Sequence, residues 1–101
     1  MSTPESKPKA LVKKRMAEEF TSCYRFCPVQ RGMGAPALDV YYCVEGLFVG
    51  VEVKAPGKKP TPRQELTMQA ICAAGGLCFV VDGAVSCEQM IDGVKRCLTS
   101  S

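Results

Sequence analysis

Asp39, Glu52 and Lys54 have the residue types and the spacing of a hydrolytic site. Carboxylate oxygens bind hard divalent cations such as Mg²⁺ and Mn²⁺. A lysine beside such a pair would stabilise developing negative charge or hold an attacking water. The three residues therefore predict metal-assisted hydrolysis of an anionic ester, with Asp39 and Glu52 as ligands of the metal.

The two segments that carry these residues are expected to pair as a β-hairpin. Residues 38–44 and 47–54 form the strands, and Glu45-Gly46 forms the tip. In this register one face is wholly apolar or aromatic, and a slip by one residue would destroy that segregation. Asp39 and Glu52 then lie opposite each other, with Cβ atoms about 5 Å apart. Their charges repel, so one must be protonated or a cation must lie between them.

The alternative is that Asp39, Glu52 and Lys54 are a solvated strand edge with one surface salt bridge, since Glu-x-Lys is a common tripeptide. Two observations favour the site. The three residues interrupt strands that are otherwise strongly apolar, and a basic loop without acidic residues follows directly.

The other elements complete a single α/β (α+β) domain over residues 1–101, in which the polar segment 1–7 is expected to be mobile. A first helix begins near Pro4, with Thr3 as its cap, or near Pro8. Residues 24–29 form a short strand, and Thr61 opens a second helix that ends at Gly75-Gly76. Residues 77–81 form a buried strand, and Ser86 caps a last helix. The predicted order is helix, three strands, helix, strand, helix.

The composition excludes other kinds of site. The 101-residue chain has no histidine, which removes imidazole bases and imidazole ligands. Its seven cysteines are odd in number and lack zinc-knuckle spacing, so free thiols in a reducing compartment are expected. Cys43 and Cys78 lie in apolar runs and are expected to fill the core. No apolar stretch resembles a signal peptide or could span a membrane, so a cytoplasmic protein is expected.

Basic residues gather in two places, although the net charge is only +3. Residues 53–64 contain four basic and no acidic side chains, and residues 7–15 contain five basic and none acidic. Such clusters beside a carboxylate site would attract a phosphate backbone. The residues predicted to contact nucleic acid are Lys58, Lys59, Arg63, Lys13, Lys14 and Arg31.

The spaced motifs resemble a known family. Asp39, the run Glu52-Val53-Lys54-Ala55-Pro56-Gly57, Gln64, Gly75-Gly76 and Phe79-Val80-Val81 are similar to the VRR-NUC branch of the PD-(D/E)xK nucleases. The likeness is greatest to the short stand-alone members of phages and bacteria. It implies a restriction-endonuclease-like core with a central mixed sheet flanked by helices, in a bacterial cytoplasm.

The resemblance also assigns roles to residues. Lys54 would be the catalytic lysine, Gln64 would face the site, and the Val53 backbone carbonyl would join Asp39 and Glu52 as a metal ligand. Glu5 would supply an acidic residue from the first helix, with Glu18 and Glu19 as alternatives. The family often has proline and aspartate adjacent, whereas Pro36 and Asp39 are separated here.

The implied activity is that of a structure-selective DNA endonuclease using Mg²⁺ or Mn²⁺, a Holliday-junction resolvase acting as a homodimer. A less selective nickase or flap nuclease is the alternative within enzymes. A non-catalytic nucleic-acid-binding module on the same fold, and a cysteine-based metal or redox protein, are the alternatives from other classes.

Overall fold

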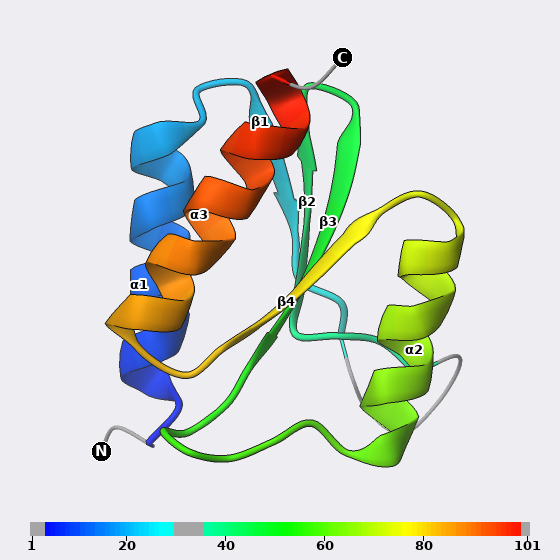
Figure 1. Ribbon diagram of the computed structural model, residues 1–101. Helices are drawn as coiled ribbons and strands as arrows, with labels where there is room; N and C mark the ends of the chain where they lie inside the picture. Colours follow the sequence, from blue (N-terminus) through cyan, green and yellow to red (C-terminus); the bar gives the residue numbers. More distant parts are fainter. Residues whose placement is uncertain (1–3, 30–35, 100–101) are drawn as a thin grey trace.

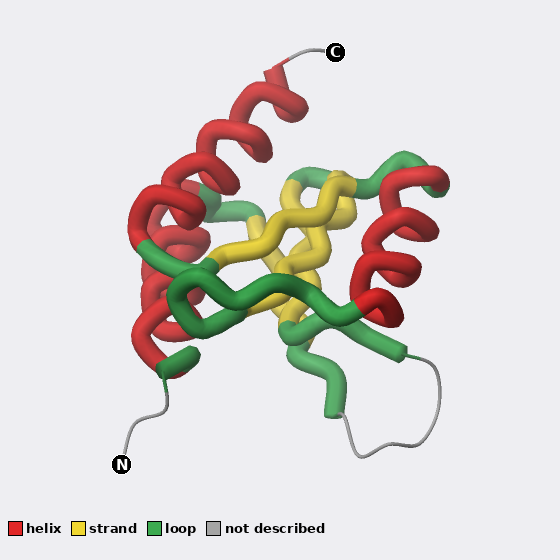
Figure 2. The backbone as a smooth tube through the Cα atoms, turned by 60° about the horizontal axis from the view of Figure 1, so that its bottom comes forward, coloured by secondary structure: helices red, strands yellow, loops and turns green. Residues whose placement is uncertain are grey.

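The computed structural model describes residues 4–29 and 36–99. Within them the elements follow the predicted order, and Figure 1 shows α1 beside α3 on one face of the sheet and α2 on the other. Figure 2 shows the sheet between these two layers. The elements are α1 (Ser6–Glu19), β1 (Cys23–Phe26), β2 (Val40–Val44), β3 (Leu47–Val53), α2 (Pro62–Ala73), β4 (Leu77–Val81) and α3 (Ala84–Thr99).

The strands of this described part form one mixed sheet in the order β1-β2-β3-β4. β2 is antiparallel to both β1 and β3, whereas β3 and β4 are parallel. The parallel pair requires the crossover through α2, which carries the chain over the second face of the sheet. The predicted fold class, a mixed sheet flanked by helices, is confirmed.

The hairpin has the predicted register, with Val44 opposite Leu47 and Val40 opposite Val51. Its tip has positive φ at Glu45 (52°) and Gly46 (86°), the signs that a type I′ turn requires. The ladder begins at Val40, so Asp39 precedes β2 instead of lying within a strand over 38–44. A side-chain interaction holds Asp39 there, as described below.

The core lies between the sheet and the α1–α3 pair. Valines alternate along β2 and β3 with their side chains on this face, and α3 contributes the widest apolar stripe. α2, by contrast, has no buried residue, so its face of the sheet is only partly covered. The buried helical residues are Pro8, Val12, Met16, Cys87, Met90, Ile91 and Val94.

The first helix begins at Ser6, two residues after Pro4 and two before Pro8. Pro8 falls in its first turn, and the first backbone hydrogen bond runs from the Lys9 N–H to the Glu5 carbonyl. Proline therefore removes no helical hydrogen bond here, because the N–H groups of the first turn have no intrahelical partner. Ser6 and Lys7, from the segment expected to be mobile, form the start of this helix, and Thr3 lies outside the described residues.

The last helix begins at Ala84, so the prediction that Ser86 is its cap is wrong. The Ser86 hydroxyl instead accepts from the Asp82 N–H (3.0 Å) and donates to the Asp82 carboxylate (2.9 Å). β1 is also shorter than predicted and ends at Phe26, two residues before Pro28. Proline has no N–H to give to a sheet ladder.

Cys43 and Cys78 were predicted to fill the core, and this prediction is wrong. All seven cysteines are free thiols, and Cys87 is the one that is buried. Cys43 is exposed and Cys78 half-buried, because both belong to the sheet face under α2. Strand alternation places their neighbours, not them, against α1 and α3.

None of the helices within residues 4–29 and 36–99 is long and apolar enough to cross a membrane.

Replacing Glu45 by Asn should stabilise the protein by about 0.5–1 kcal/mol. Asn tolerates positive φ better than Glu, and Asn-Gly is the favoured pair for this turn. Urea unfolding measures the change, and Glu45→Ala is the matched control because it removes the same charge without favouring positive φ. Equal stability of the two variants would show that the turn conformation at Glu45 is not strained.

Candidate functional site

Asp39 and Glu52 lie side by side at the end of the β2–β3 hairpin. The Asp39 N–H donates to Glu52 Oε1 (3.2 Å), and the Val53 N–H donates to Asp39 Oδ2 (2.8 Å). Each carboxylate is therefore held by the backbone of the opposite segment. The adjacency predicted from the hairpin register is present, although it is made through these bonds and not through a strand pair.

Glu52 is the buried member of the pair, with 2% of its surface exposed. Burial, followed by the neighbouring Asp39 carboxylate, raises the pKa of Glu52 from 4.5 to about 7, while Lys54 acts in the opposite direction. Lys54 Nζ lies 3.2 Å from Glu52 Oε2, and only 14% of the Lys54 side chain is exposed. The ammonium group is thus confined beside the carboxylates.

β4 fixes the position of this lysine. The Lys54 N–H donates to the Val81 carbonyl (3.0 Å), which extends the parallel pairing one residue past the end of β3. The Lys54 side chain leaves the chain on the same face as Glu52, two residues earlier. The side chains of Asp39, Glu52 and Lys54 are thereby brought together at one end of the sheet.

The donor set of this site fits a hard divalent cation. Mg²⁺ is commonly held by one or two carboxylates and retains several waters, so Asp39 and Glu52 suffice as protein ligands. No three His, Cys, Asp or Glu side chains come together as a metal cluster in residues 4–29 and 36–99. Glu5, the residue before α1, stays a prediction as a further ligand.

Glu18 and Glu19 belong to a different part of the molecule. Arg15 contacts Glu18 at 2.9 Å and Glu19 at 3.2 Å, and Lys95 of α3 forms an ion pair with Glu19. They lie at the far end of α1 from Glu5, roughly 20 Å away at 1.5 Å per residue. Glu19 therefore links α1 to α3, whereas Glu18 pairs with Arg15 within α1.

Gln64 forms the predicted capping box of α2. Its side-chain oxygen accepts from the Thr61 N–H (2.9 Å), and its own N–H donates to Thr61 Oγ1 (3.2 Å). The Gln64 side chain is thus turned toward the helix start, and its second role, facing the carboxylates, stays a prediction.

The basic loop runs along the end of the sheet from β3 to the start of α2 (Figure 1). It is anchored where the Gly57 N–H donates to Asp82 Oδ2 (3.2 Å), a bond that also lowers the pKa of Asp82. Lys58, Lys59 and Arg63 are exposed along this loop and the first turn of α2. These are three of the residues predicted to bind DNA, and they lie on the α2 side of the carboxylates.

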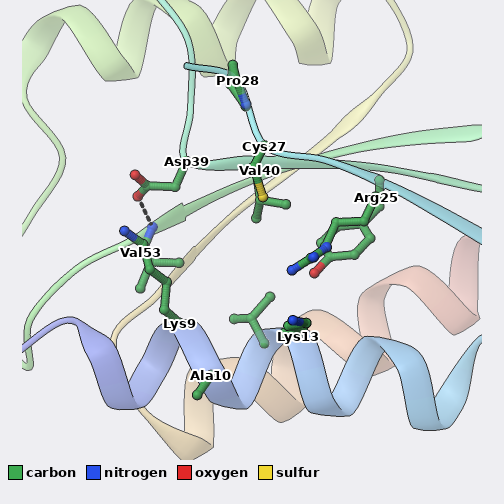
Figure 3. A pocket seen from close by; sticks show the side chains of 11 residues that line it. Lys9, Ala10, Lys13, Arg25, Cys27, Pro28, Asp39, Val40 and Val53 are labelled. Atoms are coloured by element: carbon green, nitrogen blue, oxygen red, sulfur yellow. Dashed lines mark hydrogen bonds between the residues drawn. The ribbon is translucent and has the colours of Figure 1, made fainter. Parts of the chain in front are cut away.

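A cavity of about 490 Å³ lies on the other side, between α1 and the end of β1. Figure 3 shows Lys9 and Lys13 entering it from α1, Arg25 entering from β1, and Asp39 at one end. Lys13 was predicted to bind DNA, whereas Lys9 and Arg25 were missed. Lys9 and Lys13 are four residues apart and so share a helix face, which is the signal that the sequence offered. Arg31 lies outside the described residues, and Lys14 is exposed on α1.

A solved structure of a VRR_NUC domain has the same fold as this chain. The TM-score is 0.75 at 22% sequence identity, over 90% of this chain and 97% of that chain. No protein-family model matches the sequence, and no curated protein matches it. The order of the helices and strands defines an α+β domain with a mixed sheet. The chain has the VRR_NUC fold, so the fold that the motif resemblance implied is confirmed.

Replacing Glu52 by Gln should stabilise the metal-free protein at pH 8 by about 2 kcal/mol. The raised pKa of Glu52 means that the folded state favours the protonated form. The contribution of Glu52 to stability is therefore fully present below pH 4.5 and is lost as the pH rises through about 7. Gln mimics the protonated carboxyl, so its advantage should shrink as the pH is lowered to 4.5.

Thermal unfolding in EDTA across this pH range measures the difference, with Glu65→Gln as a control at an exposed carboxylate. Parallel pH profiles for wild type and Glu52→Gln would contradict the raised pKa.

Proposed function

We propose that this protein is a metal-dependent DNA endonuclease that hydrolyses phosphodiester bonds. The observation that carries the proposal is the pair of adjacent carboxylates, Asp39 and Glu52, with the ammonium group of Lys54 at 3.2 Å from Glu52. Two ionised carboxylates side by side, one of them buried, repel each other. A bound cation would relieve this repulsion. The VRR_NUC fold supports the same conclusion.

Each residue has a defined task in this proposal. Asp39, Glu52 and the Val53 carbonyl would hold Mg²⁺ or Mn²⁺, with Glu5 as a further ligand. The bound ion supplies activation of water and neutralisation of charge on the phosphate. Lys54 orients the attacking water and stabilises the charge that develops on the phosphoryl oxygens. Gln64 closes the site from the start of α2.

The basic residues would hold the DNA backbone on both sides of the carboxylates. Lys58, Lys59 and Arg63 lie on the α2 side, while Lys13 and Lys14 lie on α1. Charge-based contacts of this kind give binding that weakens steeply as salt is added. In this proposal the scissile phosphate would lie between two positively charged surfaces.

We further propose branched DNA, in particular a four-way junction, as the substrate, and a homodimer as the active form. Each chain carries one such site, so two coordinated cuts in symmetric strands require two chains. A single cut needs only one such site, so the second candidate is a monomeric nickase or flap nuclease. Sedimentation of the protein with and without junction DNA separates them, because the dimer predicts two chains per junction.

The central test is cleavage of a four-way junction, with matched duplex and flap substrates, in Mg²⁺ and in EDTA. Wild type should cut the junction only with the divalent metal. Lys54→Ala should reduce cleavage by at least about 100-fold, the lower range for losing a group that stabilises transition-state charge, while binding persists. Lys95→Ala is the matched control, since Lys95 lies on α3 and pairs with Glu19.

Binding without cleavage in any divalent metal would favour the non-catalytic module and contradict the proposal. Full activity of Lys54→Ala would show that the site is placed wrongly. Cleavage of flaps in preference to junctions would favour the second candidate.

A further inference from the structure

We infer that the cavity between α1 and β1 is a binding pocket for one unpaired nucleotide of the strand that is cut. This inference rests on the proposed function, because it assigns the pocket to the nuclease substrate. The pocket has a volume of about 490 Å³ and opens beside Asp39. It is within the size range of small-molecule sites in proteins.

The charges of the pocket match a phosphate group. Lys9, Lys13 and Arg25 line it together with a single carboxylate, that of Asp39. None of these three cations forms an ion pair with another residue in the described part of the chain. Arg15 of the same helix, by contrast, contacts Glu18, Glu19 and Glu88. The three cations that converge on the pocket are thus available to neutralise an anion from outside.

The walls of the pocket match a base and a sugar. Most of its lining is apolar, and it comes from α1, from β2 and from the segment after β1. Tyr42 contributes an aromatic ring and a hydroxyl group, and burial raises the pKa of that hydroxyl to about 12. A phosphate ion alone would make no contact with apolar side chains. A nucleotide presents both a charged group and a flat, largely apolar ring that can pack against them. The apolar lining residues are Ala10, Val12, Cys27, Pro28, Val40 and Val53.

The position of the pocket connects it to the carboxylate pair. Asp39 and Val53 line one end of it, and the Val53 N–H binds the Asp39 carboxylate (Figure 3). A nucleotide held here would lie next to the scissile phosphate on the same strand. A fully paired duplex cannot deliver a base into the pocket without unstacking it, whereas a bulge or a single-stranded segment beside a branch offers one at little cost. The pocket therefore supplies a physical basis for selecting DNA by structure.

The test is calorimetric titration of the whole protein with dAMP in EDTA and low salt, where no cleavage occurs. Deoxyadenosine and inorganic phosphate serve as partial ligands. We expect dAMP to bind more tightly than either, and Arg25→Gln or Lys9→Gln to weaken it by about fivefold to tenfold, as expected for losing one charge-assisted contact. Arg96→Gln is the matched control, since Arg96 is also exposed but lies in the last turn of α3, away from the pocket. All three positions are exposed, and unchanged thermal unfolding verifies that each variant folds.

A competition arm identifies the source of the nucleotide. A duplex with one unpaired adenosine should displace dAMP, and a paired duplex of the same length should not. Displacement by neither duplex would assign the pocket to a free nucleotide and overturn the inference, as would phosphate binding as tightly as dAMP. Lys54→Ala should retain dAMP binding, since Lys54 does not line the pocket. A wild-type protein that binds dAMP but never cuts DNA would refute the proposed function and leave the nucleotide pocket in place.

Discussion

The structure depends on one constraint, the register of the β2–β3 hairpin. Valines on one face of these strands pack under α1 and α3, and a shift by one residue would expose them. The same register forces Asp39 and Glu52 together at the open end of the hairpin, where each accepts a backbone hydrogen bond from the opposite segment. Apolar burial on one face therefore supports an unfavourable pair of like charges on the other, and the raised pKa of Glu52 reflects that cost.

The remaining elements place charge around this pair. β4 extends its pairing to Lys54, which puts an ammonium group against Glu52. The acidic residues at the end of α1 are neutralised by Arg15 and Lys95 and take no part. The cations near Asp39 and those of the basic loop stay on the surface, so positive charge surrounds the carboxylates on both sides. Such a surface attracts and orients a polyanion.

The hairpin register, the carboxylate pair and the capping box could all be predicted from the sequence, because each follows from residues that are close along the chain. The start of the first helix could not, since it depends on whether Pro8 falls where a backbone N–H is required. Cys43 was misplaced because strand alternation, not the apolarity of the run, decides burial. The pocket of Lys9 and Arg25 was missed because α1 and β1 form it through tertiary packing alone.

The central claim is that Asp39 and Glu52 form a cation site, and calorimetric titration of the protein with Mg²⁺ at pH 8 tests it most directly. The predicted result is a saturable binding event in wild type that is lost in Asp39→Asn, with both proteins folded. Absence of binding in wild type, or equal binding by Asp39→Asn, would contradict the claim.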